Sequence, residues 1–489
     1  MTSRPSRGRP QDRPAPHVAV VGGGIAGLAA AAAVRRTRPD VVVTVLEAAP
    51  QMGGKLLLAE VGGVTVDVGA EAMLNRRPEG VGLAREAGLG DRLVHPATIA
   101  ANLWSRGRVV PMPRTLMGVP LDTRALAESG VVSKAGVARA KLDAVLPATR
   151  LDDRDVSVGW LVEERFGREV VDRLVEPLLG GVYAGHAREI SARAAVPQVV
   201  ALLDKDKSMM RAAAATTATA TTSTVPVFAG LVGGMGTLPG AVAAASGATV
   251  RTGATVRDLA RAADGGWNLV VGSAHDPEVL HADAVVLATP ARATSRLLSD
   301  VVPDAALELA RIEYASMAVV TFAFRAGDLP SVEGSGFLVP PVDGRKVKAA
   351  TYSFQKWDWV REAGRGAAPG GEDLLLLRAS IGRHREESVL QVDDAELVDL
   401  ALHDLADALG LSVRPVDSHV QRWGGGLPQY AVGHLDRVRL VRGAVAKVPG
   451  LAVCGAAYDG LGIPACIASA EAAATQVLEH LPAVERMEP

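Results

Sequence analysis

The chain has 489 residues, of which 52 are lysine or arginine and 54 are aspartate or glutamate, so its formal net charge is only -2. This balance argues against a nucleic-acid binder, which needs an excess of basic groups to neutralise phosphates. Hydrophobic residues make up 48% and charged residues 22% of the chain, which excludes global disorder. The two cysteines, Cys454 and Cys466, are too few for a disulfide-stapled secreted fold and lack the spacing of a metal site.

The ends of the chain and its hydropathy predict where the protein resides. Residues 1–16 are rich in arginine and proline without the apolar core of a signal peptide, so we expect a short disordered tail. No run of about 18 apolar residues occurs, which predicts no transmembrane helix. Charged residues interrupt the apolar pattern of 121–145, which favours at most peripheral membrane contact. We therefore expect a cytoplasmic protein.

The first structured elements form a βαβ unit. The β-branched run from His17 to Gly22 predicts a buried parallel strand, and an alanine-rich helix follows over 26–36. A second buried strand over 41–46 ends at Glu47. The spacing of about 30 residues is that of one βαβ supersecondary unit.

The remaining chain alternates between helical and strand patterns. We expect a turn at 234–240 that opens another helix. The residues 211–224 are rich in alanine and threonine and predict either a helix end or a mobile loop. Further helices are expected over 121–145, 158–178, 395–409 and from Cys466 to Leu481, and strands over 64–69, 249–256, 267–271, 283–288, 319–324, 374–381 and 451–454.

The turn between the first strand and the first helix carries a dinucleotide-binding fingerprint. Gly22-Gly23-Gly24-Ile25-Ala26-Gly27 matches G-x-G-x-x-G, and Glu47 stands about 20 residues further on, at the position of the ribose-binding acid. The first glycine allows the tight turn, the second allows a pyrophosphate to approach, and the third allows helix and strand to pack closely. The helix N-terminus offers free N–H groups and a positive dipole end. These features predict an FAD or NAD site.

Three segments together resemble the amine-oxidase-like flavoproteins. The run from Gly22 to Glu71 includes the pair Gly53-Gly54 before Lys55 and is similar to their N-terminal FAD-binding segment. The run 285–290 is similar to the strand and turn that return to the FAD domain, and 451–464 to the closing motif, with a last helix aimed at the flavin. This resemblance implies FAD rather than NAD as cofactor.

More specific motifs narrow the resemblance to the porphyrinogen oxidases. These motifs are Met112-Pro113, Tyr183-Ala184-Gly185, Leu427-Pro428-Gln429-Tyr430 and Gly462-Ile463-Pro464-Ala465-Cys466, and they most resemble those of the bacterial coproporphyrinogen III oxidases. The resemblance spans about 17–481. It implies an α/β fold in three parts: a discontinuous Rossmann-like FAD-binding domain (17–75, 225–300, 430–485), a mixed-sheet substrate-binding domain (76–110, 301–429) and a helical domain (111–224).

The resemblance also implies which residues bind FAD non-covalently. These are Gly22, Gly23, Gly24, Ile25, Ala26, Gly27, Glu47, Ala48, Gly54, Lys55, Gly69, Ala70, Glu71, Ala72, Val256, Trp423, Gly462, Ile463 and Pro464. Both cysteines are expected to serve packing, and His434 capping or packing. Arg76 and Arg77 are candidates for binding substrate propionates, since a guanidinium matches a carboxylate bidentately.

The reaction implied is oxidation of coproporphyrinogen III to coproporphyrin III in haem biosynthesis. Hydride passes to the flavin, so no metal and no dedicated catalytic side chain are expected. Gly234-Met235-Gly236 lacks a third glycine and a downstream acid, so we expect no second nucleotide site and predict oxygen as acceptor and hydrogen peroxide as product. Transient contact with other haem-pathway enzymes is expected.

Several alternatives remain open from sequence. Protoporphyrinogen IX is the other plausible porphyrinogen substrate. Amine oxidation is disfavoured because aromatic residues make up only 3% of the chain, which makes an aromatic cage hard to assemble. A carotenoid desaturase would favour a membrane-dipping apolar helix, which the sequence does not show. A flavin-binding scaffold without activity is the remaining alternative, and the intact glycine and acid motifs argue against it.

Overall fold

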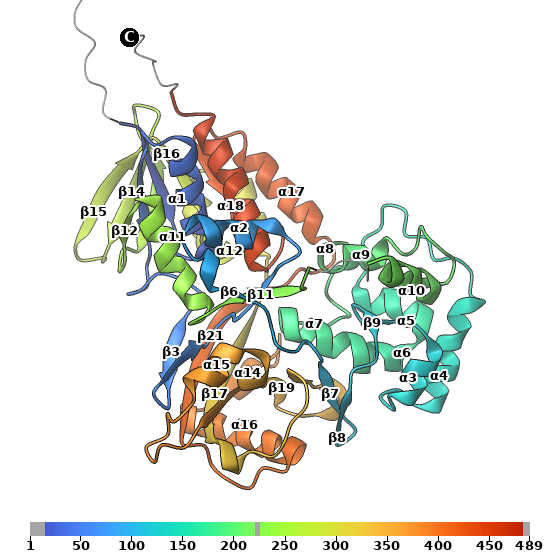
Figure 1. Ribbon diagram of the computed structural model, residues 1–489. Helices are drawn as coiled ribbons and strands as arrows, with labels where there is room; N and C mark the ends of the chain where they lie inside the picture. The colour runs from blue at the N-terminus through green and yellow to red at the C-terminus, as the bar shows by residue number, and fades with distance from the viewer. Residues whose placement is uncertain (1–14, 221–224, 483–489) are drawn as a thin grey trace, which may run out of the picture.

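A computed structural model describes residues 15–220 and 225–482. Nearly all of the expected N-terminal tail, and the end of the segment 211–224, lie outside these described residues. Figure 1 shows a sandwich of sheets and helices built from both ends of the chain, a second sheet below it, and a group of helices to one side. The α/β fold class expected from sequence is confirmed.

The first part is built on a five-stranded parallel sheet. Its order is β12-β2-β1-β16-β22, and all four pairings are parallel. The strand bounds are β1 His17–Val21, β2 Val42–Leu46, β12 Thr249–Arg251, β16 Ala284–Leu287 and β22 Leu451–Val453. These runs are short and apolar because parallel strands are buried on both faces.

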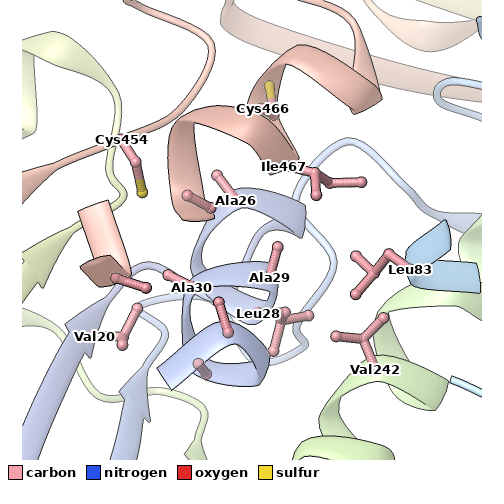
Figure 2. Close-up of a cluster of buried hydrophobic side chains, with 14 of the residues drawn as sticks. Val20, Ala26, Leu28, Ala29, Ala30, Leu83, Val242, Cys454, Cys466 and Ile467 are labelled. Carbon is pink, nitrogen blue, oxygen red and sulfur yellow. The ribbon is translucent and has the colours of Figure 1, made fainter. Parts of the chain in front are cut away.

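Helices from four distant segments cover one face of this sheet. They are α1 Ile25–Thr37, α2 Pro78–Glu86, α11 Leu238–Ser246 and α18 Ile463–Leu478, and their buried residues form one core with Val18, Val20, Val43 and Val45. Alanines on α1 let α18 and α11 approach closely. Figure 2 shows Ala26, Leu28 and Ala29 of α1 in one cluster with Leu83, Val242 and Ile467 of the other three helices.

The opposite face of the parallel sheet packs against a three-stranded antiparallel sheet and three helices. The elements are β13 Val256–Arg261, β14 Trp267–Gly272, β15 Pro277–Ala282, α12 Ala291–Leu298, α13 Pro303–Ala310 and α17 His434–Val445. The alternate residues Ala19 and Val21 of β1 point into this second core. Because successive side chains of a strand point to opposite faces, the same strands contribute apolar residues to the cores on both faces of the sheet.

Helix α2 packs in a different part of the structure from the one expected. Sequence reasoning assigned 76–110 to the substrate-binding domain, whereas Val81, Leu83 and Ala84 of α2 pack with α18 and α11 in the first core. The cause is the apolar stripe of this helix, which needs a partner surface.

The second part is a mixed seven-stranded sheet. Its order is β21-β17-β20-β19-β18-β7-β8, with one parallel pair, β18–β7. The bounds are β7 Asn102–Ser105, β8 Arg108–Pro111, β17 Tyr314–Arg325, β18 Gly336–Leu338, β19 Val347–Thr351, β20 Leu374–Ile381 and β21 Asp417–Pro428. Helix α16 (Asp394–Leu409) buries Leu397, Ala401 and Leu405 against one face of this sheet.

Short strands and helices connect the two sheets. They are β3 Leu58–Val61, β4 Val64–Asp67, β5 Met73–Leu74, β6 Leu93–Val94, β11 Phe228–Leu231, α14 Ser353–Lys356 and α15 Asp358–Ala363. Ala323, Leu374 and Leu376 of the seven-stranded sheet share a small core with Val61, Val64 and Val66.

The third part is helical. Its elements are α3 Thr123–Glu128, α4 Lys134–Lys141, α5 Val158–Phe166, α6 Arg168–Val170, α7 Glu176–Tyr183, α8 Ala192–Ala195, α9 Pro197–Val200 and α10 Met209–Ala220, with the small strands β9 Thr115–Leu116 and β10 Val119–Pro120. The predicted helix 158–178 breaks at Gly167, whose φ of 87° a helix does not accommodate. The predicted helix 121–145 is likewise two helices. Within the described residues, no helix is long and apolar enough to span a bilayer.

Candidate functional site

The fingerprint turn has the geometry of a phosphate cradle. Gly22 has a φ of +111°, and a Cβ there would lie 2.8 Å from the carbonyl oxygen of Ala288. A Cβ on Gly27 would lie 1.8 Å from the carbonyl oxygen of Gly22, so this glycine lets α1 pack on β1. In contrast, a Cβ on Gly24 would meet nothing within 4 Å, and no side chain caps α1. Open space thus faces an uncapped helix N-terminus, which suits an anionic phosphate.

Glu47 lies beside this turn at the end of β2. Its carboxylate accepts hydrogen bonds from the backbone N–H of Gly23 at 2.6 Å and of Ala49 at 2.8 Å. Ala48, between Glu47 and Ala49, is exposed. The backbone carbonyl of Glu47 accepts from Ala254, two residues before Val256, which places the start of β13 close to the acid. The predicted acid and glycines are therefore adjacent.

The second glycine pair packs against the first. The N–H of Gly53 donates to the carbonyl oxygen of Gly23 at 2.8 Å, and a Cβ on Gly54 would lie 3.3 Å from the Cα of Gly24. The carbonyl oxygen of Lys55 then accepts from the N–H of Ala70 at 3.0 Å. The segments 22–27, 53–55 and 69–72 thus form one continuous wall.

The seven-stranded sheet holds the 69–72 segment from the other side. Arg378 of β20 donates to the carbonyl oxygens of Asp67 at 3.0 Å and Gly69 at 2.9 Å. The indole of Trp423 on β21 donates to the carbonyl oxygen of Val68 at 3.3 Å, and a Cβ on Gly69 would lie 3.2 Å from that ring. The predicted residues Gly69 and Trp423 are therefore in contact.

Glu71 lies in a buried cluster of charges. Lys356 Nζ lies 2.6 Å from one carboxylate oxygen, and Arg378 lies 3.6 Å from the other. Burial opposes ionisation of Glu71, but Arg378 and Lys356 outweigh it and lower its pKa to about 2. The Glu71 side chain therefore links the connecting segment to the seven-stranded sheet, and Ala72 after it is half-buried in the core of the connecting strands.

The last helix begins at the closing motif and closes the same site. Helix α18 starts at Ile463, with Gly462 as N-cap and Pro464 in the first turn, so the expected start at Cys466 is wrong by three residues. Proline in the first turn fits because its missing N–H would have no helical partner. Ala26 of α1 shares the first core with Cys466 and Ile467 in the first turns of α18, so the two helices come together near their N-termini (Figure 2).

The two cysteines and His434 lie in packed surroundings. Both cysteines are free and buried. The imidazole of His434 stacks on Tyr430 at 3.9 Å, and its Nε2 lies 3.2 Å from the carbonyl oxygen of Tyr458. Burial lowers the pKa of His434 to about 4, so the ring is neutral. These contacts fit the expected packing roles.

The two arginines proposed for substrate lie apart from these contacts. Arg76 is exposed and has no polar partner among the described residues. Arg77 precedes α2 and pairs with Glu79 at 2.5 Å. The sequence analysis did not assign Arg378 or Lys356 to the site, because they stand in β20 and α14, far along the chain. For Arg378, a lone basic residue inside an apolar strand is a weak signal.

Comparisons with known proteins agree with this geometry. The model of the family "Flavin containing amine oxidoreductase" matches residues 25–478. The Coproporphyrinogen III oxidase of Mycobacterium tuberculosis is 38% identical over 95% of this chain and 98% of its own length. That of Bacillus subtilis is 31% identical, with the same coverage of 95% and 98%. A crystal structure from Exiguobacterium, provisionally described as a protoporphyrinogen oxidase, is 31% identical with a TM-score of 0.82, over 95% of this chain and 99% of that chain.

The family match begins at Ile25, inside the fingerprint turn, and runs through the seven-stranded sheet, the helical part and the closing helix, so it involves much more than a nucleotide-binding module. The chain therefore belongs to the flavin-containing amine oxidoreductase family, as a full-length relative of the coproporphyrinogen III oxidases.

Proposed function

We propose that this protein is an FAD-dependent oxidase that converts coproporphyrinogen III to coproporphyrin III. The observation that carries the proposal is the 38% identity over 98% of the length of a protein named for that activity, combined with an intact cradle at Gly24 and Glu47. Full-length similarity matters here because the fold alone serves many substrates.

FAD is supported by the fit of the residues present. The open space at Gly24 and the uncapped α1 suit the pyrophosphate, and Glu47 suits the ribose hydroxyls. The wall made by 53–55, 69–72 and Trp423, with the start of α18 at Gly462–Pro464, extends from the cradle toward the seven-stranded sheet. When bound, FAD would supply the two-electron acceptor that side chains lack.

Non-covalent attachment is supported by the cysteines. Burial raises the pKa of Cys466 to about 11, with Lys55 acting in the opposite direction. The thiol is therefore protonated at neutral pH and a poor nucleophile. Cys454, within the closing motif, is fully buried, and burial raises its pKa still further.

The chemistry needs positioning more than acid–base groups. Each two-electron step removes a hydride from a bridge carbon and a proton from a pyrrole nitrogen, and three such steps give the aromatic porphyrin. With oxygen as final acceptor, each step yields one hydrogen peroxide. The task of the chain is to hold the macrocycle against the flavin in the orientation that hydride transfer needs.

A second candidate substrate is protoporphyrinogen IX, favoured by the description of the Exiguobacterium structure at 31% identity. The test is an aerobic assay of the purified yellow protein with both porphyrinogens and with putrescine as an amine, following porphyrin fluorescence and peroxide. We expect the higher kcat/KM for coproporphyrinogen III, with peroxide formed in proportion. A higher kcat/KM for protoporphyrinogen IX, or turnover of the amine alone, would overturn the proposal.

A further inference from the structure

A lysine is buried in the seven-stranded sheet without a counter-ion. Lys348 of β19 is 2% exposed, and the polar contact of its Nζ is with the Sδ of Met317 at 3.7 Å. Among the described residues, no carboxylate forms an ion pair with Lys348. A thioether is neutral and only a weak acceptor, so it does not compensate a charge. A buried ammonium of this kind is costly unless an anion joins it.

A second buried cation stands next to it. Arg383 follows β20 and is 3% exposed, and its Nε has no hydrogen-bond partner. One guanidinium nitrogen donates to the carbonyl oxygen of Val339 at 3.2 Å, and the paired carboxylate, Glu386, lies 4.0 Å away. Burial, and then the charge of Arg383, lower the pKa of Lys348 to about 7. The carboxylates of Glu386, Glu176 and Asp404 act on the charge of Arg383. Lys348 is therefore the cation at this point of the sheet that lacks a compensating carboxylate among the described residues.

A β-bulge directs Lys348 to this position. Val347 pairs with Ile381, but Ala349 pairs with the adjacent Ser380, so Lys348 is the extra residue of the bulge. Bulges re-aim a side chain and are common next to active sites. Gly382, which follows β20 with a φ of +97°, would place a Cβ 3.1 Å from the Cα of Met317. The absence of a side chain at Gly382 lets the backbone of β17 at Met317 lie close to the end of β20.

The ammonium lies on the face of the sheet that is turned toward the flavin wall. Met317 pairs directly across the strands with Trp423, whose ring packs against Gly69. Arg378, two residues before Ser380 on β20, reaches the carbonyl oxygen of Gly69 from the same face. The alternate residues Ala318, Ala379 and Ile381 point to the opposite face, under α16. Lys348 and Met317 therefore lie on the same face of the sheet as Trp423 and Arg378, the two residues that contact the flavin wall.

We propose that Lys348, supported by Arg383, is a carboxylate-binding subsite that receives one propionate of the substrate. The inference rests on the proposed function and deepens it. A propionate on a mobile two-carbon arm would replace the sulfur of Met317 as the partner of Nζ and supply the missing negative charge. Met317 is half-buried and flexible, so its side chain moves aside without disturbing the strand. A vinyl group at the same place would leave the cation uncompensated, so the subsite discriminates between four and two carboxylates.

The test uses the holoprotein and a stable fluorescent ligand. Affinities for coproporphyrin III and its tetramethyl ester are measured for the wild type and for Lys348→Met, which keeps the length of the side chain and removes its charge. Lys346→Met is the matched control, because Lys346 is exposed two residues earlier on the same segment. Lys348→Gln serves as a second neutral variant. We expect Lys348→Met to weaken coproporphyrin III binding roughly ten- to a hundred-fold, with the ester affinity and the control unchanged.

The outcomes separate the two proposals. A wild type that oxidises coproporphyrinogen III while both neutral variants keep their affinity for coproporphyrin III overturns the subsite alone. An equal loss for the acid and the ester also overturns it, because a purely structural role of Lys348 would affect both ligands. A wild type that neither oxidises coproporphyrinogen III nor binds the product overturns the proposed function, and the subsite with it.

Discussion

The guanidinium of Arg378 donates a hydrogen bond of 2.9 Å to the carbonyl oxygen of Gly69, and this contact joins the seven-stranded sheet to the wall of the nucleotide site. The same group lies 3.6 Å from Glu71, which Lys356 also contacts. A rigid junction at this point matters because the relative position of the two sheets sets the distance between flavin and substrate.

Replacing Arg378 with Met should therefore weaken both stability and FAD retention. The change leaves the buried Glu71 with one of its two cations and frees two backbone carbonyls, at a cost of about 3 kcal/mol in unfolding free energy. Denaturant unfolding and FAD titration of the apoprotein measure the two effects. Arg365→Met is the control, since this exposed arginine pairs with Glu362 and should cost less than about 1 kcal/mol. Equal effects of the two changes would contradict the junction role.

Replacing Gly24 with Leu should give a folded but colourless protein. A side chain at Gly24 enters open space, so the fold tolerates it, but it occupies the volume expected for the pyrophosphate. Gly82→Leu is the control, because a Cβ at Gly82 on α2 also meets nothing within 4 Å. Absorbance of the purified proteins near 450 nm and their thermal unfolding make the comparison. A yellow Gly24→Leu protein would place the cradle elsewhere.

Lys348 should make stability depend on pH. Its folded pKa of about 7 lies below the ordinary lysine value of 10.5, so the unfolded chain binds an extra proton between these two pH values. The unfolding free energy of the wild type should therefore rise with pH through this window. Lys348→Met has no buried ammonium, so its unfolding free energy at pH 7 should exceed that of the wild type, by at most about 5 kcal/mol. The difference should shrink toward pH 10. Arg383 is the charged neighbour that acts on this lysine.

Denaturant unfolding of both proteins at pH 7, 8.5 and 10 measures this difference. Lys346→Met again serves as control and should follow the wild type at each pH, since its ammonium is exposed. A wild type and a Lys348→Met protein whose curves stay parallel would show that Lys348 does not titrate in this window.

Arg76 and Arg77 should differ in their effect on substrate. Arg76 is exposed without a polar partner among the described residues, whereas Arg77 is engaged by Glu79. Arg76→Ala should lower kcat/KM for coproporphyrinogen III roughly ten-fold and that for protoporphyrinogen IX less. Arg77→Ala should change neither by more than about two-fold. Steady-state kinetics with both porphyrinogens test this prediction. Equal losses of kcat/KM for the two substrates in Arg76→Ala would rule out that Arg76 binds a substrate carboxylate.

The parts of the site that lie close together along the chain were predictable from local sequence patterns. The turn 22–27 and Glu47 follow from one βαβ unit, whose strand and helix periods are local. The closing segment was also recognisable, although Pro464 in the first turn already indicated that α18 begins before Cys466. The break at Gly167 was missed because apolar spacing continues across it while its backbone leaves the helical region.

Only the tertiary structure decided how the charged residues meet. Glu71 finds Lys356 and Arg378 about three hundred positions further along the chain. Lys348 reaches Met317 at a bulge that shifts the register of β19, and such a bulge has no sequence period. The apolar stripe of α2 packs into the first core. In the sequence, this stripe indicates that the helix needs an apolar partner surface, but it does not indicate which one. Local patterns specify elements, whereas burial of charge and apolar surface against distant partners depends on the complete packing of the chain.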